Sequence, residues 1–190
     1  MVNLQERILD GSLCAQIEVV VSSSADAAGV ALARALGLPV RVVERHRLAD
    51  DEFQRTITEA TGEVDLVCMA GFLFLWKIPA KYEGRVINIH PALLPDFGGK
   101  GFYGRRVHEA VLKAGRAVSG CTVHYCDNEY DQGAIILQRT VAVRPEDTPD
   151  ALAARVFAEE REAYPETIRM IASGQVRYEG GRVVFADSAA

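Results

Sequence analysis

The sequence has few cysteines, no excess of basic residues and no long apolar run, and each shortage excludes a class of protein. Its four cysteines lack CxxC spacing and do not cluster with the histidines, so we expect buried thiols in a reducing cytoplasm and no metal site. The net charge of −5 argues against a nucleic-acid partner but not against a small anionic ligand. No run of about eighteen apolar residues occurs and residues 2–7 are polar, so we expect neither a membrane span nor a signal peptide.

What the chain does contain is an apolar content of 49% within 190 residues, enough for one domain over residues 1–190 with a core of its own. Strand-like and helix-like segments alternate along it. We expect strands at 17–21, 40–43, 64–70, 85–90, 121–127 and 134–143, helices at 3–10, 25–36, 50–61, 104–114 and 149–171, and a hairpin of 175–178 with 182–185. This order predicts an α/β fold with an open, mainly parallel, Rossmann-like sheet, helices on both faces and an antiparallel C-terminal extension.

Polar side chains stand at two predicted strand ends. Asn88 and His90 are two positions apart, so they share one face of a strand that Pro91 then terminates. Asp131 follows a later strand in an Asp-x-Gly turn. Open α/β sheets bind ligands outside the carboxyl ends of their strands, and an amide, an imidazole and a carboxylate there could stabilise an oxyanion and move protons.

Four segments carry a resemblance to a known family: 70–72, 86–95 (VINIHPALLP), 120–125 and 130–138. The chain resembles the folate-dependent formyltransferases from about residue 3 to about residue 175. The resemblance implies the formyltransferase fold and the transfer of a formyl group from 10-formyltetrahydrofolate to the amine of glycinamide ribonucleotide in purine synthesis. It also implies small-molecule partners only, no metal, and a catalytic set of Asn88, His90 and Asp131. Asp131 is expected to raise the pKa of His90.

The same resemblance implies two binding regions. The folate pocket is expected to be lined by Leu73, Phe74, Leu75 and Trp76, with Asn128 in the loop that closes over the pterin. Glu160 and Asn3 are expected to contact the amine-bearing substrate. By contrast, we expect His124 to be a core or supporting residue and His108 to lie on a solvated helix face.

The resemblance does not include the first elements of the family's pattern. Members of the family begin with an apolar strand and a Gly/Ser-rich phosphate loop, whereas this chain starts where that loop meets the first helix, with Asn3 as the remnant. We expect Met1 to be an internal residue of a longer protein, the alternative being a shortened relative. Three functions stay open: the formyl transfer above, another formyl-handling enzyme such as a formyltetrahydrofolate hydrolase or a transferase with a different amine acceptor, and an inert folate-binding remnant.

Overall fold

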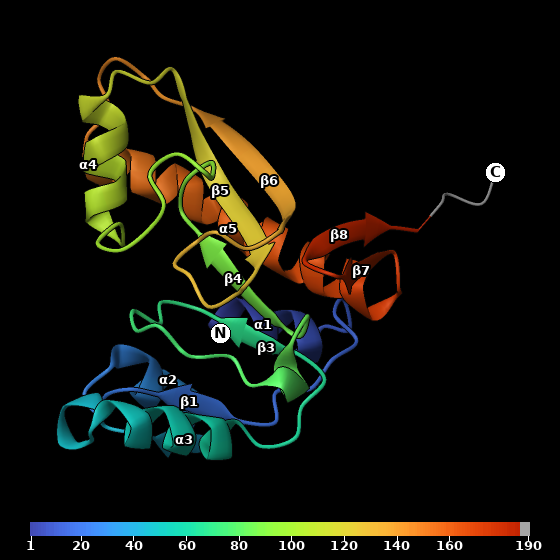
Figure 1. Cartoon of the computed structure of the whole chain (residues 1–190). Coiled ribbons are helices and arrows are strands. Elements are labelled where there is room, and N and C mark those ends of the chain that lie inside the picture. Colours follow the sequence, from blue (N-terminus) through green and yellow to red (C-terminus); the bar gives the residue numbers. More distant parts are fainter. Residues whose placement is uncertain (187–190) are drawn as a thin grey trace.

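The computed structural model describes residues 1–186 (Figure 1), and its elements can be given as two groups that follow one another along the chain. The first group contains α1 (Val2–Leu9), β1 (Val20–Ser22), α2 (Ala28–Ala35), β2 (Val40–Val42), the 3-10 turn η1 (Arg45–Arg47), α3 (Asp50–Thr61) and β3 (Val67–Met69). The second contains η2 (Ala80–Tyr82), β4 (Val86–His90), α4 (Arg105–Lys113), β5 (Val118–Tyr125), β6 (Ile135–Ala142), α5 (Pro149–Ala172), β7 (Val176–Glu179) and β8 (Arg182–Phe185). The single domain predicted over 1–190 includes residues 187–190, which lie outside the described residues.

The strands confirm an α/β fold with parallel pairing first and antiparallel pairing later. β1 pairs with β2 and β3 with β4, both in parallel. β4, β5 and β6 continue the second sheet in antiparallel order, and β7 with β8 forms the predicted terminal hairpin. One detail differs from the prediction: within residues 1–186 the parallel strands form two separate pairs, because β1 and β3 are not hydrogen-bonded to each other.

Helix α5 holds the sheet of the second group in place, lying behind β5 and β6 in Figure 1. It begins where the sequence predicts: the Thr148 hydroxyl accepts a hydrogen bond from the Ala151 N–H at 3.1 Å, and Pro149 takes the first helical position. Its inner face buries Leu152 and Val156 against the sheet. Each such apolar side chain contributes about 1.5–3 kcal/mol when fully buried.

Tyr164 then connects α5 to the strands that lead into the polar cluster described below. Its hydroxyl lies 2.7 Å from the carbonyl oxygen of Met69 and 3.2 Å from that of Ile87. A second core, built on Phe53, Trp76 and Tyr82, packs α3 against the turns around β3. None of the helices in residues 1–186 is both long enough and apolar enough to cross a membrane.

Candidate functional site

Strand pairing brings three polar side chains together at the end of β4. Asn88 and His90 project from the same face of β4, and antiparallel pairing with β5 sets His124 directly opposite Asn88. Asp131 enters from the loop between β5 and β6, where its backbone has φ +57°. This left-handed conformation is one that Asp adopts more readily than most residues.

The Asp-x-Gly turn has a steric reason for its glycine. A Cβ on Gly133 would lie 1.8 Å from the carbonyl oxygen of Tyr125, so only glycine allows the returning chain to approach β5 this closely. The turn thereby brings the Asp131 carboxylate back over the end of β4.

The Asp131 carboxylate is the centre of the cluster. Its Oδ1 lies 3.5 Å from the Asn88 amide nitrogen and 3.6 Å from His124 Nε2. Its Oδ2 accepts a hydrogen bond from the Gly99 N–H at 2.9 Å and lies 3.6 Å from His90 Nδ1. The structure therefore brings together the predicted set of Asn88, His90 and Asp131, and it adds His124.

Backbone carbonyls fix which ring nitrogen of each histidine carries a proton. His90 Nε2 lies 2.9 Å from the Phe97 carbonyl oxygen, and His124 Nδ1 lies 2.9 Å from the carbonyl oxygen of Tyr125. Because a carbonyl oxygen only accepts, both of these nitrogens must donate. In the neutral rings, His90 Nδ1 and His124 Nε2 are then acceptors, and both face the Asp131 carboxylate. The Asp131 carboxylate and these two ring nitrogens are thus three acceptors that face one another without a proton between them.

The pKa of His90 lies below its ordinary value, although Asp131 acts in the predicted direction and raises it. Burial lowers the pKa of His90, and the opposing effects of the Asp131 charge and the Phe97 carbonyl offset only part of that. For Asp131, burial opposes ionisation, but the attraction that its carboxylate exerts on a proton at His124 or His90, together with the hydrogen bond from the Gly99 N–H, lowers its pKa. Near neutral pH the cluster therefore combines an ionised Asp131 with an uncharged His90.

A small hollow with a volume of about 60 Å³ opens beside this cluster. Asn88, His124 and Asp131 contribute its polar side; the remaining lining residues are Met69, Phe72, Phe74, Leu75, Trp76, Cys126, Asp127, Glu129 and Tyr130. Three of the predicted pocket residues, Phe74, Leu75 and Trp76, thus line it. Neither Leu73, which is exposed, nor His90, which is buried, is among the lining residues.

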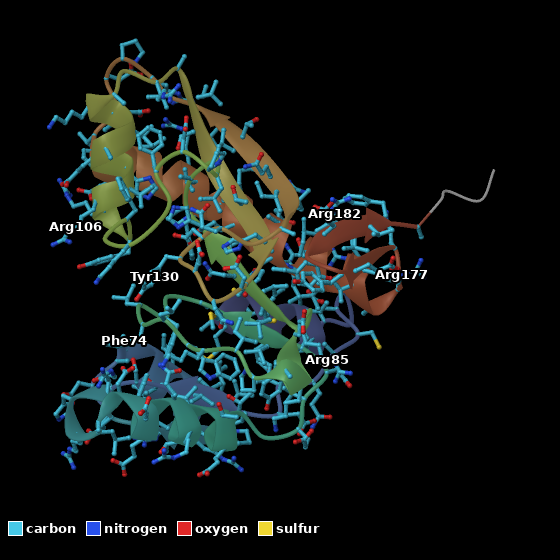
Figure 2. All side chains as sticks on the ribbon, in the orientation of Figure 1. Phe74, Arg85, Arg106, Tyr130, Arg177 and Arg182 are labelled. Atoms are coloured by element: carbon cyan, nitrogen blue, oxygen red, sulfur yellow. The ribbon has the colours of Figure 1, made fainter. Side chains whose placement is uncertain are left out.

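Two loops form the walls of this hollow and are bonded to each other. The Leu75 N–H donates to the Tyr130 hydroxyl at 3.0 Å, and the Ile78 N–H donates to Asn128 Oδ1 at 2.9 Å. Figure 2 shows Phe74 and Tyr130 on the same side of the molecule, on these neighbouring loops. Asn128, predicted to bind the folate, is thus engaged in holding the loops 72–78 and 127–131 together.

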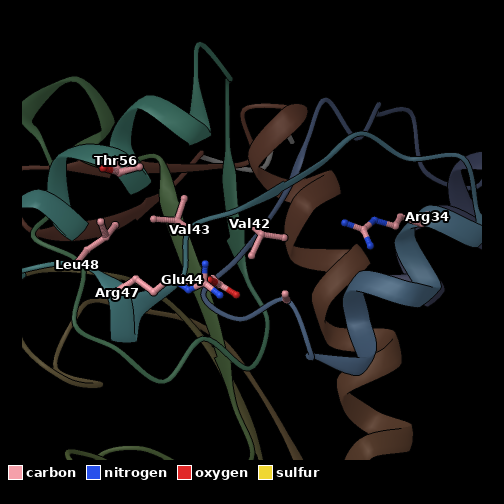
Figure 3. Close-up of a pocket in the computed structure, with 8 residues that line it drawn as sticks. Arg34, Val42, Val43, Glu44, Arg47, Leu48 and Thr56 are labelled. Atoms are coloured by element: carbon pink, nitrogen blue, oxygen red, sulfur yellow. The ribbon is translucent and has the colours of Figure 1, made fainter.

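A larger hollow of about 400 Å³ lies elsewhere, beside β2 and α3 (Figure 3). Its lining includes Arg34, Val42, Glu44 and Arg47, without a histidine, cysteine or aspartate. Size alone would favour it. We nevertheless place the candidate active site at the smaller hollow, because that one has the amide, imidazole and carboxylate groups that proton transfer requires.

Comparison with known proteins agrees with this choice. A family model described as "Formyl transferase" matches residues 2–168. A chloroplastic phosphoribosylglycinamide formyltransferase of Arabidopsis thaliana is 38% identical over 185 residues, covering 92% of this chain and 62% of the plant protein. The chain belongs to the formyl transferase family. It spans less than two thirds of the plant relative and 17% of the Gallus gallus trifunctional purine biosynthetic protein adenosine-3, which is 39% identical over 177 residues.

Solved structures of formyl transferase relatives have the same fold. Glycinamide ribonucleotide transformylase 1 of Symbiobacterium toebii superposes with a TM-score of 0.86 at 37% identity, covering 97% of this chain and 89% of that one. The phosphoribosylglycinamide formyltransferase of Coxiella burnetii gives 0.85 at 32% identity, covering 96% and 87%. A formyltetrahydrofolate deformylase of Pseudomonas syringae gives 0.85 at 22% identity, covering 98% and 61%, and so shares the fold.

The two predicted substrate residues, Asn3 and Glu160, are not among the residues that line the hollow. Asn3 on α1 donates its side-chain N–H to the carbonyl oxygen of Arg161 on α5 at 2.8 Å, which places it near Glu160. Burial raises the pKa of Glu160 to about 7. The roles of both residues stay predictions.

Two other expectations about titratable side chains were wrong. His108 is only 4% exposed, because α4 turns Val107, His108 and Val111 inward together, and its Nδ1 has no hydrogen-bond partner within residues 1–186. Cys14 is exposed, whereas the other cysteines are buried or half-buried. Residues 1–186 contain no group of three His, Cys, Asp or Glu side chains placed to hold a metal ion.

Proposed function

We propose that this chain transfers a formyl group from 10-formyltetrahydrofolate to the amine of glycinamide ribonucleotide, with Asn88, His90 and Asp131 as its catalytic residues. The observation that carries the proposal is the Asp131 carboxylate, which lies between the amide of Asn88 and two imidazole nitrogens at the polar side of the hollow. Family membership and the named activities of the relatives support it.

The proposed role of Asn88 is to stabilise negative charge. The amine nitrogen first bonds to the formyl carbon, which becomes tetrahedral, and negative charge develops on the formyl oxygen. The bond from that carbon to the folate nitrogen then breaks. In the substrate-free protein the Asn88 amide faces His124 Nε2 at 3.3 Å and Asp131 at 3.5 Å. The formyl oxygen would accept a hydrogen bond from one of these N–H groups, and a single donor of this kind contributes roughly 100- to 1000-fold to turnover.

The proposed role of Asp131 and His90 is to move one proton. The attacking amine must lose a proton and the departing folate nitrogen must gain one. Asp131 is ionised and can accept that proton through a bridging water, and the free Nδ1 of His90 lies 3.6 Å away to share it. When Nδ1 holds the proton, His90 is an imidazolium and forms a charge-assisted pair with the Asp131 carboxylate. The pair lasts until the leaving folate nitrogen takes the proton.

The side chains that line the hollow suit a pterin, but the volume of the hollow is too small for one. Its aromatic and aliphatic lining fits a flat heteroaromatic ring, with Phe74, Leu75 and Trp76 as the folate-contacting residues and Leu73 at the rim. A space of about 60 Å³ holds a few water molecules rather than a bicyclic ring. The loops joined by Tyr130 and Asn128 must therefore part, which would free the Asn128 amide for the pterin.

For the amine-bearing substrate we propose contacts with Glu160 and Asn3. Glu160 has a pKa of about 7, so it can bind an ammonium group as a carboxylate or a hydroxyl group in either form. Asn3 lies beside it through the contact with Arg161.

The proposal is tested by measuring formyl transfer with both substrates, together with loss of the formyl group when the amine is omitted. We expect transfer by the wild-type chain and a 100- to 1000-fold lower kcat for Asn88→Ala. Formyl loss without the amine at the same rate would instead identify a hydrolase. Folate binding without either reaction would identify an inert binding protein.

A further inference from the structure

A second polar cluster lies beside His90, on the sheet that carries the candidate active site. Strand pairing sets His90 on β4 opposite Thr122 on β5, and Thr122 opposite Gln138 on β6. Residues paired in this way project from the same face of a sheet, so the three side chains form a row. His90 and Thr122 are buried, whereas Gln138 is exposed on the last strand of this sheet.

The hydroxyl of Thr122 binds the turn that follows β4. It donates to the Ala92 carbonyl oxygen at 2.7 Å and accepts from the Leu94 N–H at 3.0 Å. The Gln138 amide nitrogen donates to the same hydroxyl and to the Leu94 carbonyl oxygen, both at 2.9 Å. The one hydrogen and two lone pairs of the hydroxyl are thus all used. Because Thr122, Ala92 and Leu94 are all buried, the backbone groups of the turn have no ready alternative partner in solvent.

Leu94 transmits this constraint to a strained part of the turn. A Cβ on Gly98 would lie 2.4 Å from the side chain of Leu94 and 3.3 Å from that of Asp131, so Leu94 packs directly against the Gly98 backbone. The preceding residue, Phe97, has φ +57°, a left-handed conformation that is unfavourable for a bulky side chain. Such a conformation persists only where the surrounding structure holds it, and it is common at functional sites.

The residues on either side of Gly98 each bond to a side chain of the site. The Phe97 carbonyl oxygen lies 2.9 Å from His90 Nε2, and the Gly99 N–H donates to Asp131 at 2.9 Å. The first contact keeps the proton of the neutral ring on Nε2 and leaves Nδ1 as an acceptor that faces Asp131. Without it, the ring could carry its proton on Nδ1 and donate it to the carboxylate. In that state Nδ1 could not accept the proton that the amine must lose.

We propose that Thr122 is a positioning residue that holds the turn after β4 through its bonds to Ala92 and Leu94. By keeping the Phe97 carbonyl in place, it keeps the proton of His90 on Nε2. That this placement matters for formyl transfer rests on the proposed function. Thr122 is not among the residues that line the hollow, and it acts through the turn and not on the reacting groups.

The test compares the wild-type protein with Thr122→Val, which keeps the shape of the side chain and removes its hydroxyl. NMR of the ring nitrogens at alkaline pH should show one tautomer of His90 in the wild type, with the proton on Nε2, and a mixture in the variant. His124 is an internal control in the same spectra, because its Nδ1 bonds to a carbonyl of its own strand and its tautomer should not change. In the formyl-transfer assay, kcat should fall roughly 10- to 100-fold while KM stays within a few-fold.

Two further variants separate positioning from general stability. Thr122→Ser keeps the hydroxyl and should restore the single tautomer. Thr167→Val is the matched control, because Thr167 is also fully buried but its hydroxyl has no hydrogen-bond partner within residues 1–186, so His90 should be unchanged. Should Thr122→Val not fold, Gln138→Met removes the outer hydrogen bonds of the cluster and should shift the tautomer of His90 in the same direction by less.

The inference is overturned if the wild-type ring is already a mixture, if the folded Thr122→Val or its substitute Gln138→Met keeps the single tautomer, or if Thr167→Val loses it equally. A single tautomer that depends on Thr122, in a chain that transfers no formyl group, would contradict the proposed function and leave this inference standing.

Discussion

At the scale of single residues, burial and charge oppose each other in the site, and burial decides the state of His90. The carboxylate of Asp131 is close enough to favour an imidazolium, yet the pKa of His90 lies below its ordinary value because little solvent reaches the ring. An uncharged His90 suits proton transfer better than a charged one, since it can accept the proton that the amine must lose.

The state of His90 can be measured directly by NMR titration of its ring. We expect a pKa below the ordinary value of about 6.5 in the wild-type protein. In Asp131→Asn the pKa should fall further, because the charge that favours the imidazolium is gone. A wild-type pKa above 6.5 would mean that Asp131 outweighs burial and that the reaction starts from a charged ring.

His108 gives a second prediction, for stability against pH. Burial lowers the pKa of His108, so the unfolded chain takes up a proton near pH 6.5 that the folded protein binds only at lower pH. The free energy of unfolding should therefore fall as pH drops from about 6.5 toward the folded pKa. His108→Leu removes this ring and its unpartnered Nδ1, so denaturant unfolding should show a smaller loss between pH 7 and pH 5 than the wild type; an equal loss would contradict the assignment.

At the scale of elements, the loops 72–78 and 127–131 determine access to the hollow. Backbone N–H groups of the first loop donate to side chains of the second, at Tyr130 and Asn128. The first loop is also bonded to α3 through Gln54 and Thr58, whereas Asn88 and His124 sit on paired strands. If the second loop moves away from the first while the paired strands stay in place, a ring could enter the hollow and then be enclosed from water, as the proposed function requires.

Tyr130→Phe should loosen this cover. The substitution removes the acceptor of the Leu75 N–H, so we expect a loss of about 0.5–1.5 kcal/mol in unfolding free energy and faster folate association in stopped-flow experiments. Tyr103→Phe is the control, because Tyr103 is exposed and takes no part in the two hydrogen bonds that join the loops. An unchanged association rate in Tyr130→Phe would show that the loops part without breaking this bond.

Most elements could be predicted from sequence because their signals are local. The helix 50–61 matches its prediction to the residue, and Thr148 caps α5 as its side chain predicts. The strands 17–21 and 64–70 are shorter than predicted, with three residues each in β1 and β3, because apolar content shows a strand's burial and not how far its pairing extends.

At the scale of the whole molecule, the site is assembled from distant segments, and this limited its prediction. The motifs identified Asn88, His90 and Asp131, and the structure brings them together. The facing position of His124 depends on the register between β4 and β5, and the hydrogen bond between Leu94 and Thr122 joins residues 28 positions apart. The inward turn of His108 and the lowered pKa of His90 likewise follow from burial, which the order of residues does not reveal.

The most direct test is the steady-state rate of formyl transfer in Asp131→Asn, which keeps the shape of the side chain and removes its charge. We expect kcat at neutral pH to fall by roughly 100- to 10,000-fold, with the KM for glycinamide ribonucleotide within a few-fold of the wild-type value, because the loss is in proton transfer and not in binding. A kcat within tenfold of the wild type would contradict a reaction centred on the Asp131 carboxylate.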